Sequence, residues 1–234
     1  MSLSKIEISA FFPAYNEAGN IENLTRRTAN TLKQLAAKWE IIIIDDGSKD
    51  NTAKISQRLV KEIPGVRYIC HEKNRGYGGA VKTGLKNASY EWIFFTDGDN
   101  QFDTREIELL LPHTKNADFV LGYRLNRKDN FMRQLNAWAW GTLVRTLFGL
   151  HGISRDIDCA FKLFKRKVVD EYELYSEGAM ISTELLVKAK KLGYKFKEQG
   201  VHHLPRTVGT QTGANLKVIL RAFKELFKLY KYLK

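Results

Sequence analysis

Short apolar runs alternate with longer segments of helical period along the first half of the chain. Five runs have the length and composition of buried strands, at residues 6–12, 40–45, 66–70, 91–96 and 117–123. Apolar residues at helical spacing between them predict helices over residues 21–37, 52–63, 78–88 and 104–113. Strands that alternate with helices of this length are typical of βαβ units. The pattern predicts an α/β fold with a mostly parallel sheet flanked by helices, and the unbroken apolar run at 41–44 favours it too.

The second half of the chain mixes apolar stripes with basic residues. In residues 215–234 an apolar stripe at helical spacing is flanked mainly by lysine and arginine. Residues 131–150 have a similar mixture and include Trp138 and Trp140, a residue type favoured at bilayer interfaces. Each segment fits a basic amphipathic helix on a membrane surface, and equally a surface helix whose stripe faces the core. Because the basic half holds two such segments, we favour the membrane surface.

Length and composition fit a single domain over residues 1–234, with a more helical and basic part at residues 126–234. Apolar residues make up 44% of the chain and aromatic residues 12%, which argues against disorder. No apolar run reaches the ~18 residues of a membrane-spanning helix, and the N-terminus lacks the features of a signal peptide. Cys70 and Cys159 lie outside any CxxC pattern, so we expect both thiols to stay reduced, as in the cytoplasm.

The formal charge of +12 lies almost entirely in the second part of the chain. Residues 1–100 carry 14 basic and 12 acidic side chains, whereas residues 101–234 carry 24 and 14. A basic half usually faces an anionic partner such as nucleic acid, a phospholipid headgroup or a phosphorylated substrate. A solvated lysine-rich surface has the same charge, so charge alone leaves these alternatives open.

Polar and acidic residues directly follow four of the predicted strands. Their sequences are PAYNE at 13–17, DDGS at 45–48, EKNRGYGG at 72–79 and DGDNQ at 97–101. The carboxyl ends of parallel strands meet at one edge of a sheet, where α/β proteins bind their ligands. We therefore expect all four segments to contribute to a single site.

Asp97 and Asp99 are the most informative pair in these segments. Two carboxylates separated by one residue can converge on one hard cation, with phosphates and water filling the rest of its coordination shell. Proteins hold magnesium or manganese against a diphosphate in this way. A turn rich in Asp, Gly and Asn also commonly follows a strand, but the other three segments favour the metal site.

The remaining segments offer contacts for a nucleotide. Asp45 can accept hydrogen bonds from a base or a ribose, and Gly47 permits a tight turn close to a ligand. Tyr15 can stack on a base, and Glu17 lies near the start of the predicted helix. The glycines of NRGYGG resemble a phosphate loop only weakly and fit close packing of a helix equally well, and Lys82 suits both interpretations.

In this order, the segments FFPAYNE, IIIIDDGSKDNT, NRGYGGA and DGDNQ resemble the family 2 glycosyltransferases. Within that family the chain is similar to the dolichyl-phosphate mannose synthase-like, polyprenyl-phosphate glycosyltransferases. The resemblance implies a glycosyltransferase A-type fold, a GDP- or UDP-sugar donor, a Mg²⁺ or Mn²⁺ cofactor and inversion at the sugar. Residues 1–125 would then form the nucleotide-sugar-binding half, and residues 126–234 the acceptor-side half.

The resemblance also implies roles for single residues. Carried over by position, the matches are Pro13, Tyr15, Glu17 and Asp45 for the donor nucleotide, Asp97, Asp99 and Gln101 for the metal, and Arg124, Arg133 and Arg206 for the donor diphosphate and acceptor phosphate. The chain departs from the family at residues 158–162, which read DCAFK in place of Thr-Ser-Gly-Phe-Arg, and within VGTQTG at 208–213. Both departures lie on the acceptor side, so the identity of the acceptor stays open.

The expected reaction is sugar transfer to a polyprenyl phosphate by an enzyme peripheral to the cytoplasmic face of a membrane. A metal ion at Asp99 would act as Lewis acid for the departing nucleoside diphosphate. A lipid phosphate is already ionised and needs no strong base. The alternative acceptor, a sugar hydroxyl of a polysaccharide or glycolipid, would require a carboxylate such as Asp158 to take its proton.

Two further alternatives belong to other functional classes. A nucleic-acid-binding protein would account for the basic charge and would bind less tightly as salt rises. It would leave the acid-rich strand ends unexplained, so we expect no nucleic-acid partner. A catalytically inactive adaptor on a lipid surface would use the same fold, since fold does not fix activity.

Overall fold

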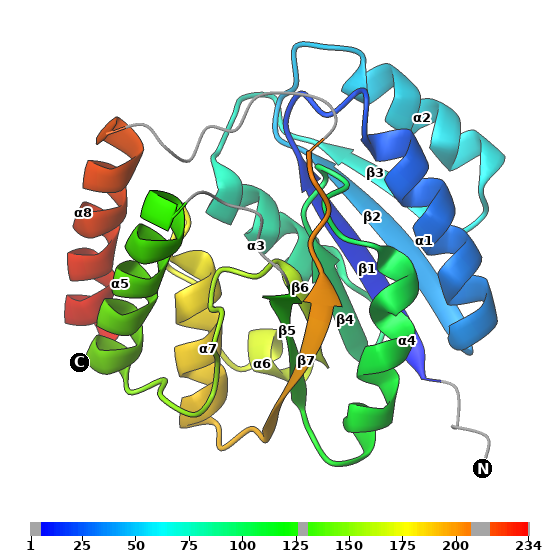
Figure 1. Cartoon of the computed structure of the whole chain (residues 1–234). Coiled ribbons are helices and arrows are strands. Elements are labelled where there is room, and N and C mark those ends of the chain that lie inside the picture. Colours follow the sequence, from blue (N-terminus) through cyan, green and yellow to red (C-terminus); the bar gives the residue numbers. More distant parts are fainter. Residues whose placement is uncertain (1–5, 126–130, 207–215, 234) are drawn as a thin grey trace.

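The computed structural model describes residues 6–125, 131–206 and 216–233, and for residues 131–136 and 216–221 it describes only the backbone. Within this part of the chain seven strands form one sheet in the order β3-β2-β1-β4-β6-β5-β7 (Figure 1). All strands point the same way except β6, which runs antiparallel to β4 and β5. The strands are β1 (Glu7–Ala14), β2 (Lys38–Asp45), β3 (Val66–Cys70), β4 (Trp92–Thr96), β5 (Phe119–Leu125), β6 (Phe161–Lys165) and β7 (Phe196–His202).

The predicted mostly parallel sheet is confirmed, and so is the reason for its apolar strands. The four isoleucines at 41–44 in β2 are fully buried, because β1 and β3 pair with them on either side and helices cover the sheet. Phe94 and Phe95 of β4 are buried in the same way. The strands therefore form the rigid centre from which the polar loops emerge.

Helices follow the strands as the sequence predicts, with one difference at residues 104–113. That segment divides into η1 (Thr104–Glu106), α4 (Ile107–Leu110) and η2 (Leu111–Lys115), because Pro112 has no N–H to continue an α-helix. The remaining helices are α1 (Ile21–Leu35), α2 (Thr52–Glu62), α3 (Tyr77–Asn87), α5 (Phe131–Phe148), α6 (Lys167–Asp170), α7 (Ile181–Lys191) and α8 (Leu216–Leu233).

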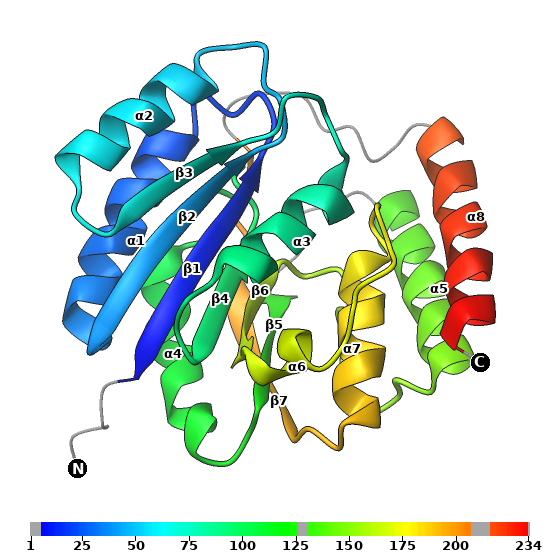
Figure 2. The same ribbon diagram turned by 180° about the vertical axis from the view of Figure 1, so that it is seen from behind.

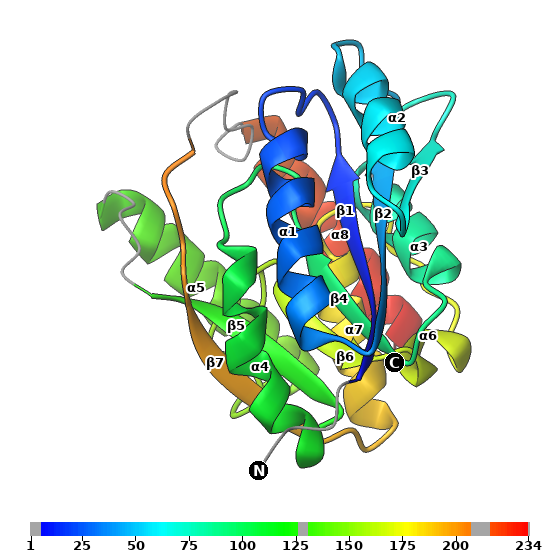
Figure 3. The ribbon, with the colours of Figure 1, turned by 90° about the vertical axis from the view of Figure 1, so that its right-hand side faces the viewer.

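Helices cover both faces of the sheet. In Figure 1 α1 and α4 lie on the near face, and the view from behind in Figure 2 shows α3, α6 and α7 on the other face. The side view in Figure 3 shows the sheet between these two layers. Gly84 of α3 lets that helix lie close to β1, since a Cβ there would come within 2.3 Å of the Phe11 ring. Gly84 lies outside NRGYGG, so this contact does not decide between the two interpretations of that segment.

The second half of the chain contains more strand than the sequence predicts. β6 and β7 complete the sheet, although FKLFK and FKEQGVH carry lysines that mask their strand character. Lys162 of β6 is 1% exposed and donates hydrogen bonds to the carbonyls of Ile157 and Cys159. Hydrogen bonding to nearby backbone lets a strand bury a cationic side chain, which a hydrophobicity pattern does not foresee.

α5 and α8 lie side by side at the end of the molecule away from α1 and α2 (Figures 1 and 2). Leu226 and Leu229 of α8 are buried, whereas Phe227 on the same helix is 63% exposed and Trp138 of α5 is 64% exposed. The apolar stripe of α8 is therefore only partly used for packing. Among the residues that the structure describes, no helix is both long and apolar enough to cross a bilayer.

Candidate active site

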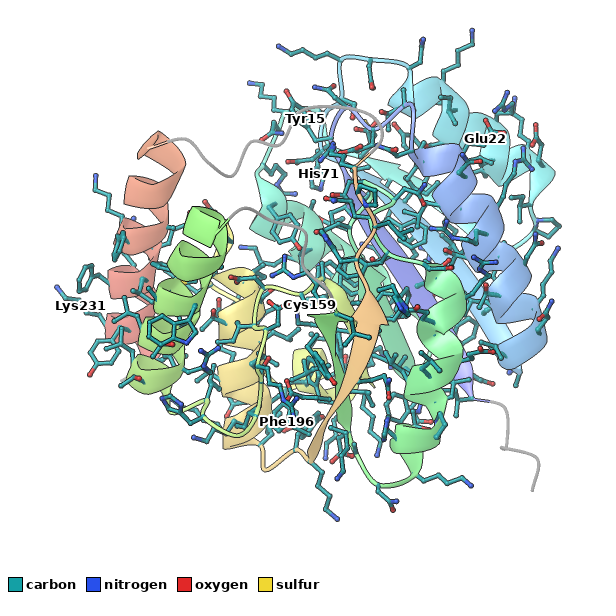
Figure 4. The ribbon with its side chains drawn as sticks, viewed as in Figure 1. Tyr15, Glu22, His71, Cys159, Phe196 and Lys231 are labelled. Atoms are coloured by element: carbon teal, nitrogen blue, oxygen red, sulfur yellow. The ribbon has the colours of Figure 1, made fainter. Side chains whose placement is uncertain are left out.

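The loops after β1 and β2 are joined by hydrogen bonds at the carboxyl edge of the sheet. Asn16 has a positive φ of 56°. This conformation lets its N–H donate to Ser48 Oγ (2.9 Å) and its side-chain oxygen accept from the Lys49 N–H (2.8 Å). The Glu17 N–H donates to Thr52 Oγ1 at the start of α2 (2.9 Å). The two segments predicted to bind a nucleotide thus form one rim, where Figure 4 shows Tyr15.

Asp45 stands at the end of β2 and is fully buried. Its carboxylate accepts from the Ser48 N–H and from the Tyr68 hydroxyl, both at 2.8 Å. Burial and the hydrogen bonds with Cys70 and Asp45 raise the pKa of Tyr68. Gly47 turns the chain at a φ of 74°, and a Cβ there would lie 3.0 Å from the Asn74 nitrogen. The predicted tight turn at Gly47 is present, and Asp45 shapes it from inside.

Asp97 and Asp99 lie just past β4, in the loop predicted to hold a metal. Asp97 accepts a hydrogen bond from the Tyr77 hydroxyl (2.8 Å), and Asp99 accepts from the Gln101 N–H (3.1 Å). Pro13 belongs to β1 rather than ending it, and its carbonyl accepts from the Gly98 N–H between the two acids (3.1 Å). The first and fourth polar segments therefore meet directly.

The electrostatics of this pair indicate an excess of negative charge. Burial and the neighbouring Asp99 raise the pKa of Asp97 to about 7. Burial also raises the pKa of Asp99, although the Gln101 N–H and Arg206 act in the opposite direction. A divalent cation would relieve this repulsion, and carboxylate oxygens suit Mg²⁺ or Mn²⁺. The described residues contain no group of three or more His, Cys, Asp or Glu that could hold a metal ion. Phosphate and water oxygens would therefore supply the remaining ligands.

Arg206 connects the first and fourth segments from the far end of the chain. Its guanidinium donates to Glu17 Oε1 (2.6 Å) and lies 3.6 Å from Asp99 Oδ2. Glu17 also accepts from the Asn20 side chain (2.6 Å). The structure thus brings Glu17, Asp99 and Arg206 together.

Gln101 contacts the segment before Arg206. Its side-chain amide donates to the Leu204 carbonyl (3.1 Å), and the Leu204 N–H donates to the Gln101 carbonyl (2.8 Å). Its assignment as a metal ligand stays a prediction. In the structure it ties the 202–206 strand end to the acidic loop.

Arg124 lies on the opposite wall, at the end of β5. It forms a two-pronged pair with the Asp156 carboxylate, at 2.6 and 2.7 Å. Burial alone would lower the pKa of Arg124, but the Asp156 pair outweighs it and raises that pKa. Asp158 is exposed, and its charge contributes to the raised pKa of Tyr77 and of Arg124. Asp158 and Arg124 therefore face the Asp97 side of the site.

One predicted residue, Lys82, is not brought to this cluster, and the side chain of another is not described. Lys82 lines a depression of about 580 Å³ between α3 and the α6 segment, together with Lys86 and Arg166. Five residues separate it from Tyr77 on α3, which turns it well away from Asp97. The side chain of Arg133 lies outside the described residues.

Several residues that shape the site were not singled out from the sequence. Arg27 of α1 donates to Asn100 Oδ1 (2.6 Å) and the Phe102 carbonyl (2.7 Å), which supports the positive φ of 60° at Asn100. Asp46 accepts from the N–H groups of Arg75 (2.8 Å) and Gly76 (2.9 Å). The second acid of DDGS was a visible signal for Asp46, whereas nothing local marks Arg27.

Comparisons with known proteins show the family to which this chain is related. A family model described as glycosyl transferase family 2 matches residues 9–173. The chain is 29% identical to a dolichyl-phosphate beta-glucosyltransferase of Trichomonas vaginalis, over 97% of this chain and 73% of that protein. It is 32% identical to the dolichyl-phosphate beta-glucosyltransferase of Dictyostelium discoideum, over 86% and 67%. It is 27% identical to the dodecaprenyl-phosphate galacturonate synthase of Rhizobium johnstonii, over 75% and 52%. The chain thus spans only about half the length of this last relative.

A solved structure shares the fold. Glucosyl-3-phosphoglycerate synthase from Mycobacterium tuberculosis, in complex with Mn²⁺ and UDP-glucose, superposes with a TM-score of 0.74 at 17% identity. The likeness covers 97% of this chain and 79% of that one. At this identity it shows the architecture alone, and it confirms the predicted sheet flanked by helices.

Proposed function

The chain belongs to glycosyl transferase family 2, and from that membership we propose that it transfers a sugar from a nucleoside-diphosphate donor to a polyprenyl phosphate. One observation carries the proposal. Two partly buried carboxylates, Asp97 and Asp99, crowd their charge at the carboxyl edge of the sheet, and Asp99 lies beside the guanidinium of Arg206. A divalent cation and a diphosphate complete such a set, since each neutralises the charge of the other.

Asp97 and Asp99 are the residues that would hold Mg²⁺ or Mn²⁺. When bound, the ion supplies Lewis-acid stabilisation to the leaving diphosphate. Arg206 adds fixed positive charge to the same oxygens, and because Glu17 and Asp99 orient it beforehand, little reorganisation is needed. The cation assignment draws support from the Mn²⁺ named with the mycobacterial enzyme.

The donor nucleotide would lie on the rim formed by the first two loops. Tyr15, at 43% exposed, offers a ring for stacking on the base. Pro13, Glu17, Asp45 and Gly47 would form the floor beneath it. A UDP-sugar is the first choice of donor because the structural neighbour holds UDP-glucose, and a GDP-sugar is the second.

The acceptor would approach from the wall that carries Arg124 and Asp158. A phosphate acceptor matches Arg124, because a guanidinium binds phosphate oxygens in pairs and Asp156 holds it in place. The acceptor is already an oxyanion, so it attacks the sugar carbon without a strong base, and displacement from the side opposite the diphosphate inverts that carbon. The named activities of the Trichomonas and Dictyostelium relatives support a lipid phosphate.

The membrane surface would be met by α5 and α8. Both helices carry an exposed aromatic side chain, Trp138 on α5 and Phe227 on α8, and the lysines that flank Phe227 suit anionic headgroups. This placement would bring a lipid-borne phosphate to the protein. The expected location, peripheral at the cytoplasmic face, belongs to this proposal.

The test is direct transfer with purified protein. UDP-glucose and GDP-mannose, each radiolabelled, would be incubated with Mn²⁺ and either a polyprenyl phosphate in detergent or a glycolipid with free hydroxyls. We expect labelled polyprenyl phosphate from one donor, and a loss of ~100-fold or more in Asp99→Asn, because metal-borne charge stabilisation is worth several kcal/mol. Asp170→Asn, an exposed carboxylate on α6, is the matched control. Transfer only to the glycolipid would reject the phosphate acceptor, and no transfer from either donor would reject the proposed function.

A further inference from the structure

The hydroxyl of Tyr77 reaches Asp97 from the first residue of α3. It donates to Asp97 Oδ1 at 2.8 Å, and the Tyr77 ring packs obliquely against Phe95 at 6.4 Å. A donor on Oδ1 fixes the plane of the carboxylate and leaves Oδ2 to face a ligand. The tyrosine of NRGYGG thus contacts the acidic loop, although the phosphate-loop interpretation concerned only the glycines around it.

The first turn of α3 is clamped on two sides, so Tyr77 has little freedom. On one side the Gly76 N–H donates to the buried Asp46 carboxylate (2.9 Å). On the other the Gly78 N–H donates to the Glu177 carbonyl (2.9 Å). A Cβ on Gly78 would come within 2.5 Å of the Glu177 carbonyl carbon. Only glycine permits the two backbones to approach this closely.

The segment that carries Glu177 is itself anchored by a buried ion pair on α7. Glu184 and Lys188 are 0% and 2% exposed and pair with each other. The Glu184 carboxylate also accepts from the N–H groups of Tyr175 (2.8 Å) and Ser176 (2.7 Å). Because both charges and both backbone donors are satisfied, this pair fixes the segment in one arrangement.

We propose that Tyr77 is a positioning residue for Asp97, and that the clamp of Gly78 on Glu177, anchored by Glu184, sets where its hydroxyl lies. This inference rests on the proposed function, in which Asp97 holds the divalent cation. The hydroxyl holds the Asp97 carboxyl group in the orientation in which it would meet the cation. Partners of this kind change metal affinity by about 10- to 100-fold when they are removed.

The test is Mn²⁺ affinity measured by calorimetry on the full chain, with UDP present at a fixed saturating concentration. Tyr77→Phe keeps the ring and removes only the hydroxyl, and we expect it to weaken Mn²⁺ binding by about tenfold. Tyr194→Phe is the control, because its buried hydroxyl has no hydrogen-bond partner among the described residues and lies away from Asp97. Unchanged affinity in Tyr77→Phe, with wild-type protein binding Mn²⁺, would overturn the positioning role alone. Absence of Mn²⁺ binding by the wild type would overturn the metal assignment and this role with it.

A second pair of variants tests the clamp while Tyr77 stays intact. Gly78→Ala forces α3 away from the Glu177 backbone, so we expect Mn²⁺ binding to weaken even though every polar side chain is present. Glu177→Ala removes a side chain but keeps the carbonyl that Gly78 uses, so it should bind Mn²⁺ like the wild type. If both variants unfold cooperatively and bind Mn²⁺ as tightly as the wild type, the clamp does not set the position of Tyr77.

Discussion

Replacing Asp97 with asparagine should stabilise the metal-free protein, although it removes a residue to which we assign metal binding. Burial and Asp99 raise the pKa of Asp97 to about 7, whereas an unperturbed aspartate has a pKa of about 3.9. Between these pH values the unfolded chain releases this proton while the folded chain keeps it, so the free energy of unfolding falls as pH rises. The loss is complete above about pH 7 and absent below about pH 4.

The magnitude follows from the difference between the two pKa values. About three pKa units correspond to roughly 4 kcal/mol. Asp97 and Asp99 titrate as a pair, so a share of this energy belongs to Asp99. Asparagine keeps an oxygen for the Tyr77 hydroxyl and carries no charge. We therefore expect Asp97→Asn to raise the free energy of unfolding by about 1–3 kcal/mol at pH 8, and by progressively less toward pH 5.

The assay is urea denaturation of wild type and Asp97→Asn at pH 5, 6.5 and 8 in the presence of EDTA. A second series with Mn²⁺ should stabilise the wild type by mass action and leave the variant nearly unchanged. Asp170→Asn, which removes an exposed carboxylate, should match the wild type throughout. If Asp97→Asn is the less stable protein at pH 8 in EDTA, the argument from buried charge is refuted.

Three further outcomes follow from the structure. Arg27→Met removes two hydrogen bonds to the acidic loop, and a hydrogen bond from a charged group contributes about 1.5–3 kcal/mol. Binding of the nucleotide sugar, measured by calorimetry, should therefore weaken more than tenfold. Unchanged binding would contradict the role of Arg27 in supporting this loop. Exchange of Phe227 and Trp138 for serine should reduce co-sedimentation with anionic vesicles without lowering the Tm, because both side chains are exposed. Burial raises the pKa of Cys159 to about 12, so a thiol reagent at pH 8 should label the exposed Cys70 alone until urea is added.

Local pattern sufficed for the part of the molecule built from βαβ units. The first strands and helices lie where periodicity places them, because each apolar run is covered on both faces. The acidic residues after β4 and the turn at Gly47 were also predictable, since parallel strands end at one edge. Hydrophobic periodicity does not show which distant residues meet. The family resemblance, based on the order of the four segments, supplied Arg206, which contacts Glu17 and Asp99 from the other end of the chain.

The rest depends on contacts between residues far apart in the sequence. Lys162 makes FKLFK look exposed, yet the carbonyls of Ile157 and Cys159 satisfy its ammonium inside the protein. Pairing between Arg27 and Asn100 cannot be inferred from either neighbourhood alone. The partners of such polar residues are set by the tertiary structure, so the periodicity of the sequence does not predict these contacts.

The reversed direction of β6 means that the chain re-enters the sheet at the same edge at which it leaves after β5. β5 leaves the sheet at Leu125 and β6 re-enters it at Phe161, on adjacent antiparallel strands whose ends lie at the same edge. The connection that contains α5 therefore begins and ends at one edge of the sheet, and lengthening such a connection changes its closure entropy only slowly. We expect this connection to tolerate changes in length while the register of the parallel strands stays untouched, so the surface it forms can vary separately from the proposed donor site.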